Sequence, residues 1–148
     1  MAGSATFAVT AVTPDLSVKE LTINWTGDAT AGTVPSYSSD DVTVAWGGGT
    51  QTLTSLLKGA YGLVAITQPG TPAPTSYSVT MNDAYGVDFL DGKLMSLSTS
   101  LSARANIQTN DPVSTALTFA LTGNTTPSAI GTIVIKLLYA GTARWRLQ

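Results

Sequence analysis

The sequence contains neither cysteine nor histidine. The absence of cysteine excludes disulfides and thiolate nucleophiles, and the absence of histidine removes the commonest general base and a common zinc ligand. The Gly-x-Ser-x-Gly motif of serine hydrolases does not occur. Gly47–Gly49 is followed by Thr-Gln-Thr rather than by Gly-Lys-Ser/Thr, which excludes a phosphate-binding loop. We therefore expect a protein that is not an enzyme and that binds no cofactor.

Charge is also scarce. Only 11% of the residues are charged, whereas a typical globular domain has about 25%. The cationic residues are scattered along the chain and form no basic stripe; they are Lys19, Lys58, Lys93, Arg104, Lys136, Arg144 and Arg146. Because phosphate binding needs clustered lysines and arginines, we expect no nucleic-acid partner.

Long hydrophobic runs are missing too. No apolar segment is long enough to span a bilayer, so we expect no membrane partner. The first residues, MAGSATFAVTAV, lack the basic start of a secretory signal peptide. This favours synthesis in the cytosol, with any later export by another route.

Threonine and serine take the place of the missing charge, and both suit the exposed faces of strands. Two interpretations remain open. In one, the protein spends its life packed against other subunits, where charge is not needed for solubility. In the other, it is a secreted or virion-like β domain whose Thr/Ser face is simply hydrated.

The length of 148 residues is that of one domain, which we expect to span residues 1–148. Short apolar or alternating segments, separated by turn residues about every dozen positions, predict roughly eight to ten strands. The predicted fold is all-β: a single-domain antiparallel β-sandwich or barrel, Greek-key or jelly-roll-like, with long loops. Such an arrangement also hides most strand edges.

The stretch from Tyr61 to Leu90 is predicted to form the centre of an antiparallel sheet. Tyr61–Thr67 is apolar and rich in β-branched residues, and Tyr77–Asn82 alternates with a period of two. Between them, Gln68–Pro74 contains three prolines and cannot be helical. Asp83–Gly86 is predicted to turn the chain into a further strand at Val87–Leu90.

Two other segments give clear strand predictions. Lys19–Thr26 places Leu21, Ile23 and Trp25 on one face, so a slip of one residue would expose three large side chains. Thr132–Tyr139 is the most hydrophobic segment and is predicted to be a central strand.

The remaining segments leave alternatives. Asp41–Trp46 and the glycines that follow predict a hairpin, with Trp46 either in the core or part of an exposed contact tip. Ser55–Gly59 is either one turn of helix or a connection. Asp91–Ile107 is either a short helix or an irregular excursion, because its leucines have helical spacing but serine is a mediocre helix former. Thr142–Leu147 is predicted to be the last strand.

Three aspartates lie close together in the sequence around the predicted turn: Asp83, Asp88 and Asp91. Paired carboxylates can serve a glycosidase, and several oxygens from one loop can bind calcium. The segment lacks the Asp-x-Asp-x-Asp-Gly pattern of calcium loops, and nothing in the sequence provides a substrate groove. We therefore interpret these residues as solvated turn and strand-end aspartates and expect no metal.

The aromatic residues allow two interpretations. Trp46, Tyr61, Tyr77 and Tyr85 could form a platform for a sugar, or they could be core and interface residues. Arg144–Arg146, with Trp145 between the two arginines, is either a contact for an acidic neighbour or part of a charged edge strand.

Four segments of the chain resemble a family of small β-rich virion proteins of tailed bacteriophages: Leu21–Asp28, Tyr61–Gly70, Ala73–Leu90 and Ile130–Leu138. A run of the form strand, NPG-x-x-APT, strand, D-x-x-G-x-D-x-L is familiar in that family. Gln68 stands here in place of the asparagine, and the matching residues are Pro69, Gly70, Ala73, Pro74, Thr75, Asp83, Gly86, Asp88 and Leu90.

The resemblance implies a structural component of the phage particle, most like the head decoration or cement proteins. Such proteins bind the outer capsid surface and clamp neighbouring capsomers. The implied partners are the major capsid protein and copies of this chain in a homotrimer, and the implied location is the capsid surface of the virion. The candidate interface residues are Asp28, Val34, Pro35, Tyr37, Trp46, Pro69, Pro72, Pro74, Tyr85, Arg144, Trp145 and Arg146.

Two other functions remain open from the sequence. The protein could belong to the neck, the tail or a head fibre of the virion, where its copy number would be low. Alternatively, it could be a carbohydrate-binding or adhesin β-sandwich module outside the phage context.

Overall fold

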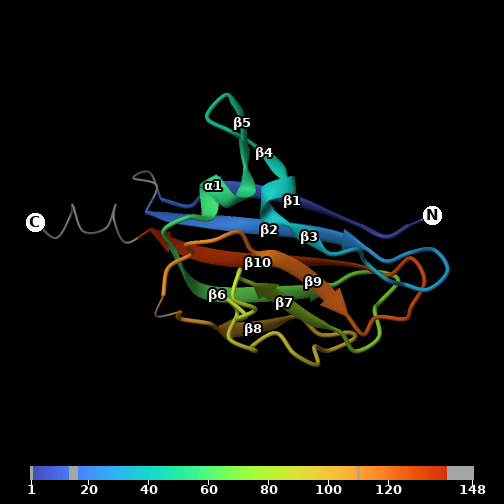
Figure 1. Cartoon of the computed structure of the whole chain (residues 1–148). Helices are drawn as coiled ribbons and strands as arrows, with labels where there is room; N and C mark the ends of the chain where they lie inside the picture. Colours follow the sequence, from blue (N-terminus) through green and yellow to red (C-terminus); the bar gives the residue numbers. More distant parts are fainter. Residues whose placement is uncertain (1, 14–16, 110, 140–148) are drawn as a thin grey trace, which may run out of the picture.

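The computed structural model describes residues 2–13, 17–109 and 111–139, in which two antiparallel sheets pack face to face as a β-sandwich (Figure 1). The prediction of an all-β antiparallel sandwich is confirmed, and the described strands do not close into a barrel. The predicted strand Thr142–Leu147 and the candidate residues Arg144, Trp145 and Arg146 lie outside the described residues.

The larger sheet has five strands among the described residues. In spatial order they are β1 (Ser4–Ala11), β2 (Val18–Thr26), β10 (Ile130–Tyr139), β6 (Ala60–Pro69) and β8 (Ala103–Asn106). The prediction of a central strand at Thr132–Tyr139 is confirmed, because β10 pairs with β2 on one side and β6 on the other. Ile133, for example, lies opposite Ile23 on one side and Thr67 on the other.

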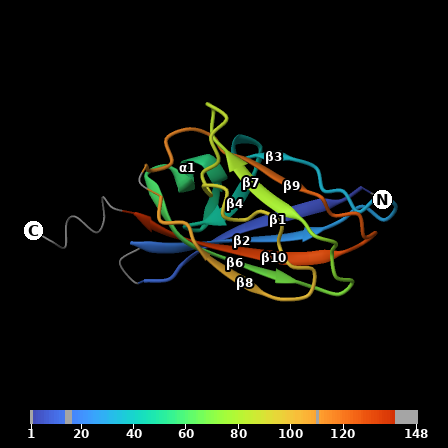
Figure 2. The same ribbon diagram turned by 90° about the horizontal axis from the view of Figure 1, so that it is seen from below.

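The smaller sheet contains β3 (Tyr37–Ser38), β9 (Thr118–Thr122) and β7 (Ser78–Asn82), in that spatial order. Figure 2 shows β7 and β9 lying across the strands of the larger sheet. An irregular segment covers the second edge of β7, since Phe89 donates to Met81 and the Val79 amide donates to Leu94. This segment decides the open question about Asp91–Ile107, which is an irregular excursion that ends in β8.

Two predictions for the stretch Tyr61–Leu90 are wrong. Its two strands belong to different sheets, because both edges of β6 are occupied by β10 and β8 whereas β7 pairs with β9. The proline-rich loop Gln68–Pro74 therefore carries the chain from one sheet to the other. Val87–Leu90 forms no strand and contributes only an isolated bridge between Asp88 and Asn82.

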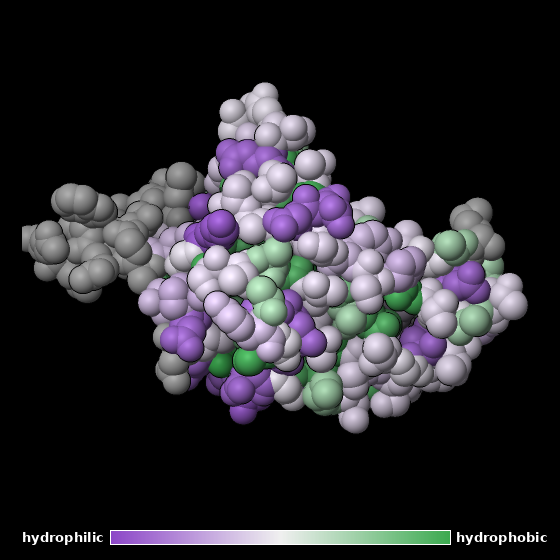
Figure 3. All heavy atoms as spheres, viewed as in Figure 1, coloured by the Kyte–Doolittle hydropathy of each residue, from purple (hydrophilic) through white to green (hydrophobic). Residues whose placement is uncertain are grey.

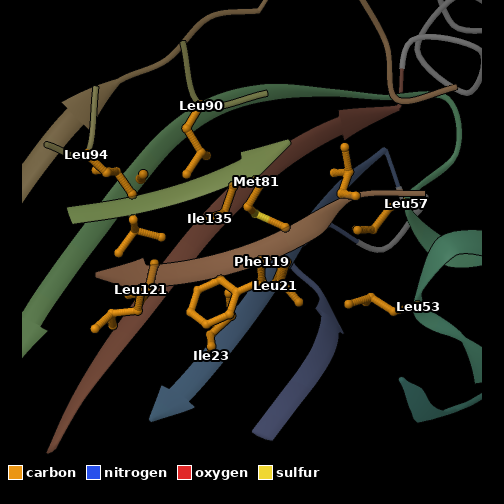
Figure 4. Close-up of a cluster of buried hydrophobic side chains, with 14 of the residues drawn as sticks. Leu21, Ile23, Leu53, Leu57, Met81, Leu90, Leu94, Phe119, Leu121 and Ile135 are labelled. Carbon is orange, nitrogen blue, oxygen red and sulfur yellow. The ribbon is translucent and has the colours of Figure 1, made fainter. Parts of the chain in front are cut away.

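The core lies between the two sheets and is built from alternate residues of the strands. Leu21 and Ile23 of β2 are almost fully buried, as the alternation predicts. Figure 4 shows them facing Met81 and Phe119 of the smaller sheet. Leu90, from the irregular segment, fills the same layer and is 0% exposed. Burying such apolar side chains is the main contribution to stability in a domain of this kind.

A separate two-stranded hairpin stands on the larger sheet near β1. It consists of β4 (Thr43–Trp46) and β5 (Gly49–Thr52), and it is flanked by a short 3-10 helix (Ser39–Asp41) and by α1 (Leu53–Leu57). The hairpin prediction is confirmed, with Gly47 and Gly48 supplying the positive φ angles of 62° and 83° that the turn requires. Among the described residues, no helix has the length and apolar character needed to cross a membrane.

Candidate functional site

Three loops meet at the end of the sandwich where β2 and β6 finish, and Asn124 holds them together. The side-chain amide of Asn124 donates to the carbonyl oxygen of Gly32, and its Oδ1 accepts from the backbone amides of Thr75 and Thr126. Asn124 is 4% exposed, so these bonds are shielded from water. The loop after β2, which contains Gly32, and the loop after β6, which contains Thr75, are therefore fixed to each other at this end. We call this cluster of three loops the loop end.

Asp28 forms the turn that opens the loop end. Its Oδ1 accepts from the backbone amides of Thr30 and Ala31 at 2.7 and 2.6 Å. The bond from Ala31, followed by the bond from Thr30, lowers the pKa of Asp28 below its usual value. The carboxylate thus has a structural task in its own chain, whether or not it contacts a partner.

Two candidate interface residues of the loop end are buried in the chain itself. Val34 is 8% exposed and packs in the core, and Pro74 is buried between the loop and the sandwich. Their side chains are not available to a partner, because the loops fold back onto the sheets instead of extending. Pro35 and Pro72 are exposed, and Pro69 is partly buried at the end of β6.

Tyr37 is packed against its own chain rather than projecting. Its hydroxyl oxygen accepts from the backbone amide of Ala5 at 3.1 Å. Its ring meets Phe7 edge to face, with 5.6 Å between the ring centroids. Tyr37 thereby joins the smaller sheet to β1 of the larger one, and most of its ring serves the fold.

In the described part of the chain, the β4–β5 hairpin protrudes from the sandwich. Figure 3 shows its outer end standing clear of the body. All four residues of β5 are exposed, and nothing lies within 4 Å of a side chain placed at Gly47 or Gly48. Residues 42–57 carry no charge. A two-stranded ribbon that buries so little is marginally stable alone, so its base must be anchored.

The anchor of the hairpin is a lysine between two aromatic rings. The Nζ of Lys19 lies 5.0 Å from the centroid of the Trp46 ring and 4.0 Å from that of Tyr139. Such contacts stabilise by about 0.5–1 kcal/mol at exposed sites and more where water is excluded. Trp46, the last residue of β4 before the Gly47–Gly48 turn, is therefore not an exposed contact residue; it is half-buried and packs against the core.

Burial also shifts two pKa values at this anchor. The Tyr139 hydroxyl donates to the carbonyl oxygen of Leu56 in α1, and desolvation raises the pKa of Tyr139 to about 12. Desolvation lowers the pKa of Lys19, because burial disfavours its charged form. The contacts connect β2, β4, β10 and α1 at the end of the sandwich opposite the loop end.

The aspartates around the β7 turn are used to hold the backbone. Asp83 Oδ1 accepts from the amides of Tyr85 and Val87. Asp88 accepts from Met81 and Leu90 through Oδ1 and from Gly92 through Oδ2. In the described part of the chain, no group of three or more acidic, histidine or cysteine residues could hold a metal ion.

The β7 turn also carries the most exposed aromatic residue described. Tyr85 is 82% exposed, and Val87 beside it is 61% exposed. Tyr77, one of the four residues considered for a sugar platform, is instead a core residue, 1% exposed and packed against Trp25. Tyr85 remains available as a single contact residue.

A groove of about 250 Å³ runs beside this turn. The aspartates that line it are Asp83, Asp88, Asp91 and Asp111. Apolar side chains, among them Phe89, Ile107 and Val113, line it as well, and no lysine or arginine of the described residues does. We call it the acidic groove. Sequence reasoning found three of its aspartates but missed Asp111, because only the fold brings residues 107–114 beside the β7 turn.

Ser55 and Lys58 have the Ser-x-x-Lys spacing of some serine hydrolases, which the sequence reasoning missed. The Ser55 hydroxyl donates to the Thr52 carbonyl oxygen at 2.8 Å and contacts Gln51 at 3.4 Å. Both Ser55 and Lys58 are exposed, and no hydrogen bond between them is present among the described residues. Thr52 is the N-cap of α1 and accepts from the Ser55 amide, so the bonds of Ser55 to Thr52 have a structural role at the start of a single helical turn.

No protein-family model matches the sequence, and no curated protein sequence matches it. The CBM22-1 xylan-binding domain of Paenibacillus barcinonensis Xyn10C is similar in structure, with a TM-score of 0.41, 14% identity, and coverage of 91% of this chain and 81% of that one. A chain of the cyanophage Pam1 capsid asymmetric unit is also similar, with a TM-score of 0.39, 16% identity, and coverage of 90% and 86%. These similarities are too distant to support an assignment of function.

Proposed function

We propose that the protein is a non-catalytic structural component of a tailed-bacteriophage virion. More specifically, we propose a capsid decoration or cement protein that binds the outer surface of the head and stabilises the capsid lattice. Its partners are then the major capsid protein and further copies of itself, arranged as a homotrimer.

The sequence landmarks that carry the family resemblance all have a place in the fold. Asp83 and Asp88 shape the β7 turn by accepting backbone amides. Thr75 joins the proline-rich loop to Asn124, and Leu90 is fully buried. The resemblance therefore rests on residues that build the sandwich, which supports the proposed family but does not by itself locate a binding surface.

The uncharged hairpin arm is the observation that most favours an assembly role. A ribbon whose strand β5 is exposed throughout, with no charges or prolines to block its edges, is prone to pair with another chain. Free proteins usually blunt such edges, whereas a subunit that docks on a lattice covers them. Each arm would form one weak contact, and repetition by symmetry would make the attachment strong.

The direct test is the copy number of this chain in purified virions, measured by quantitative mass spectrometry against the major capsid protein. A ratio near that of the capsid protein is the expected result. A ratio far below it would move the protein to the neck, tail or a head fibre. Its absence from the particle would overturn the proposal.

A binding experiment tests the arm. The change Ala45→Glu/Gln51→Glu adds charge to exposed positions of the hairpin, and Ser100→Glu adds charge to an exposed loop elsewhere as a control. We expect the hairpin variant to lose at least tenfold in affinity for empty capsids in a sedimentation assay, and the control to bind like the wild type. Equal binding by both variants would exclude the arm as the contact.

Binding of the same protein to a glycan array distinguishes the decoration proposal from the carbohydrate-binding alternative. The decoration proposal predicts no saturable glycan binding. Saturable binding that Tyr85→Ala or Trp46→Ala abolishes would favour a carbohydrate-binding module instead.

A further inference from the structure

The acidic groove has the features of a peptide-docking surface. Its aspartates combine with apolar side chains, and the exposed Tyr85 and Val87 lie on the turn that forms one wall. Asp88 is already bonded to three amides, whereas Asp91 and Asp111 are exposed and make no side-chain hydrogen bond among the described residues. A fitting occupant supplies positive charge together with an apolar or aromatic side chain.

The chain itself contains one segment of this chemistry. Residues 140–148, which lie outside the described residues, read AGTARWRLQ. Two of the seven cationic residues of the protein flank a tryptophan there, and a leucine follows. Arginine suits such a site because its planar guanidinium forms paired hydrogen bonds with carboxylates.

The last described residue lies close to the groove. Tyr139 pairs with Ala60 in the larger sheet, and the carbonyl oxygen of Ala60 accepts from the amide of Val113, which lines the groove. The last described residue, Tyr139, and the groove are thus at the same end of the sandwich. An extended segment of nine residues reaches roughly 30 Å.

We propose that the acidic groove binds the C-terminal segment, residues 140–148, of a second copy of this chain. Such a contact joins two different surfaces, and repeated head to tail it closes into a ring when the rotation permits. The homotrimer of the proposed function is a ring of this kind, and the inference rests on that proposal for its biological setting. It specifies which surfaces hold the copies together.

The first test measures oligomeric state by sedimentation velocity of the full chain. The wild type is expected to be a closed oligomer at micromolar concentration. Both Arg144→Glu/Arg146→Glu and Asp111→Lys are expected to shift it to the monomer, whereas the control Arg104→Glu, on β8 outside the groove, leaves it unchanged. A wild type that is monomeric throughout, or an oligomer insensitive to both variants, would overturn the proposal.

Combining the variants tests direct contact. A chain carrying Asp111→Lys together with Arg144→Glu/Arg146→Glu restores an opposite-charge pair between position 111 and the exchanged arginines. Recovery of the oligomer supports docking, and failure to recover in a chain that folds with wild-type thermal stability contradicts it.

A peptide experiment avoids any change to the protein. The synthetic peptide ARWRLQ, residues 143–148, is expected to dissociate the wild-type oligomer, and the control peptide AEWELQ is expected to have no effect. An oligomer that persists at saturating peptide concentration would contradict the two-copy proposal. None of these results depends on capsid attachment, so the copy number in virions still decides the proposed function separately.

Discussion

The side-chain amide of Asn124 donates a hydrogen bond of 2.6 Å to the carbonyl oxygen of Gly32, although 92 residues separate the two in sequence. The same side chain accepts from Thr75, so one residue fixes two loops of the loop end to a third. A buried polar group that bonds several loops fixes their relative positions. A buried amide that loses its hydrogen-bond partners lowers the stability of the folded state.

We predict that Asn124→Ala destabilises the protein by about 2–3 kcal/mol, because the Gly32 carbonyl and the Thr75 amide lose their partner in a place shielded from water. Urea unfolding followed by tryptophan fluorescence measures the change. Thr30→Ala is the matched control, since its side chain is exposed in the same loop cluster. A loss below 0.5 kcal/mol, roughly that of a surface substitution, would show that the loops hold together without Asn124.

Gly131 gives a second prediction. A methyl group at Gly131 would lie 2.8 Å from the indole ring of Trp25, which is 1% exposed and cannot move into solvent. We expect Gly131→Ala to cost about 1–3 kcal/mol through overpacking. Gly49→Ala is the control, because open space surrounds that position and its backbone needs no positive φ. Differential scanning calorimetry gives the melting temperatures of the two variants, and equal values would contradict the close packing of Gly131 against Trp25.

The fold was predictable from the sequence where one residue pattern was sufficient to determine it. The alternation Leu21, Ile23, Trp25 specifies which face of β2 is buried, and hydrophobicity along the whole of β10 indicated its central place. Alternation does not say which sheet a strand joins. The assignment of β6 and β7 to one sheet was wrong for this reason, since pairing partners come from segments far along the chain.

The candidate sites depended even more on distant contacts. Trp46 was recognised from sequence, but its position is set by Lys19 and Tyr139, which the sequence does not place beside it. Asn124 was passed over because it stands in a segment interpreted as a plain loop. The feature that could have revealed Asn124 is its position in the turn Gly-Asn-Thr-Thr-Pro, because asparagine side chains in turns commonly bond nearby backbone groups.

The Asp28 turn predicts an acid-dependent loss of stability. The folded state lowers the pKa of Asp28, because the amides of Ala31 and Thr30 favour the carboxylate. The resulting stabilisation is present above the pKa of the unfolded chain and is lost as the pH falls through the folded pKa. The difference in unfolding free energy between wild type and Asp28→Ala should therefore shrink below pH 4, roughly the pKa of a free aspartate. A difference that stays constant from pH 7 to pH 2 would contradict this role.

Tyr139 predicts the opposite dependence, at alkaline pH. Desolvation raises the pKa of its hydroxyl to about 12 in the folded protein, above the value of about 10 for a free tyrosine. The folded state holds this proton more tightly, so the stabilisation is complete below pH 10, roughly the unfolded pKa, and is lost as the pH rises through the folded pKa.

Tyr139→Phe removes both this titration and the hydrogen bond to Leu56, which costs about 1 kcal/mol at neutral pH. The gap in stability between wild type and variant should therefore narrow as the pH rises toward 12. Tyr61→Phe, on the neighbouring strand β6, controls for the titration of other tyrosines. If the gap seen by circular dichroism does not change with pH, the Tyr139 hydroxyl is not held by burial, and the anchor of the hairpin rests on Lys19 and Trp46 alone.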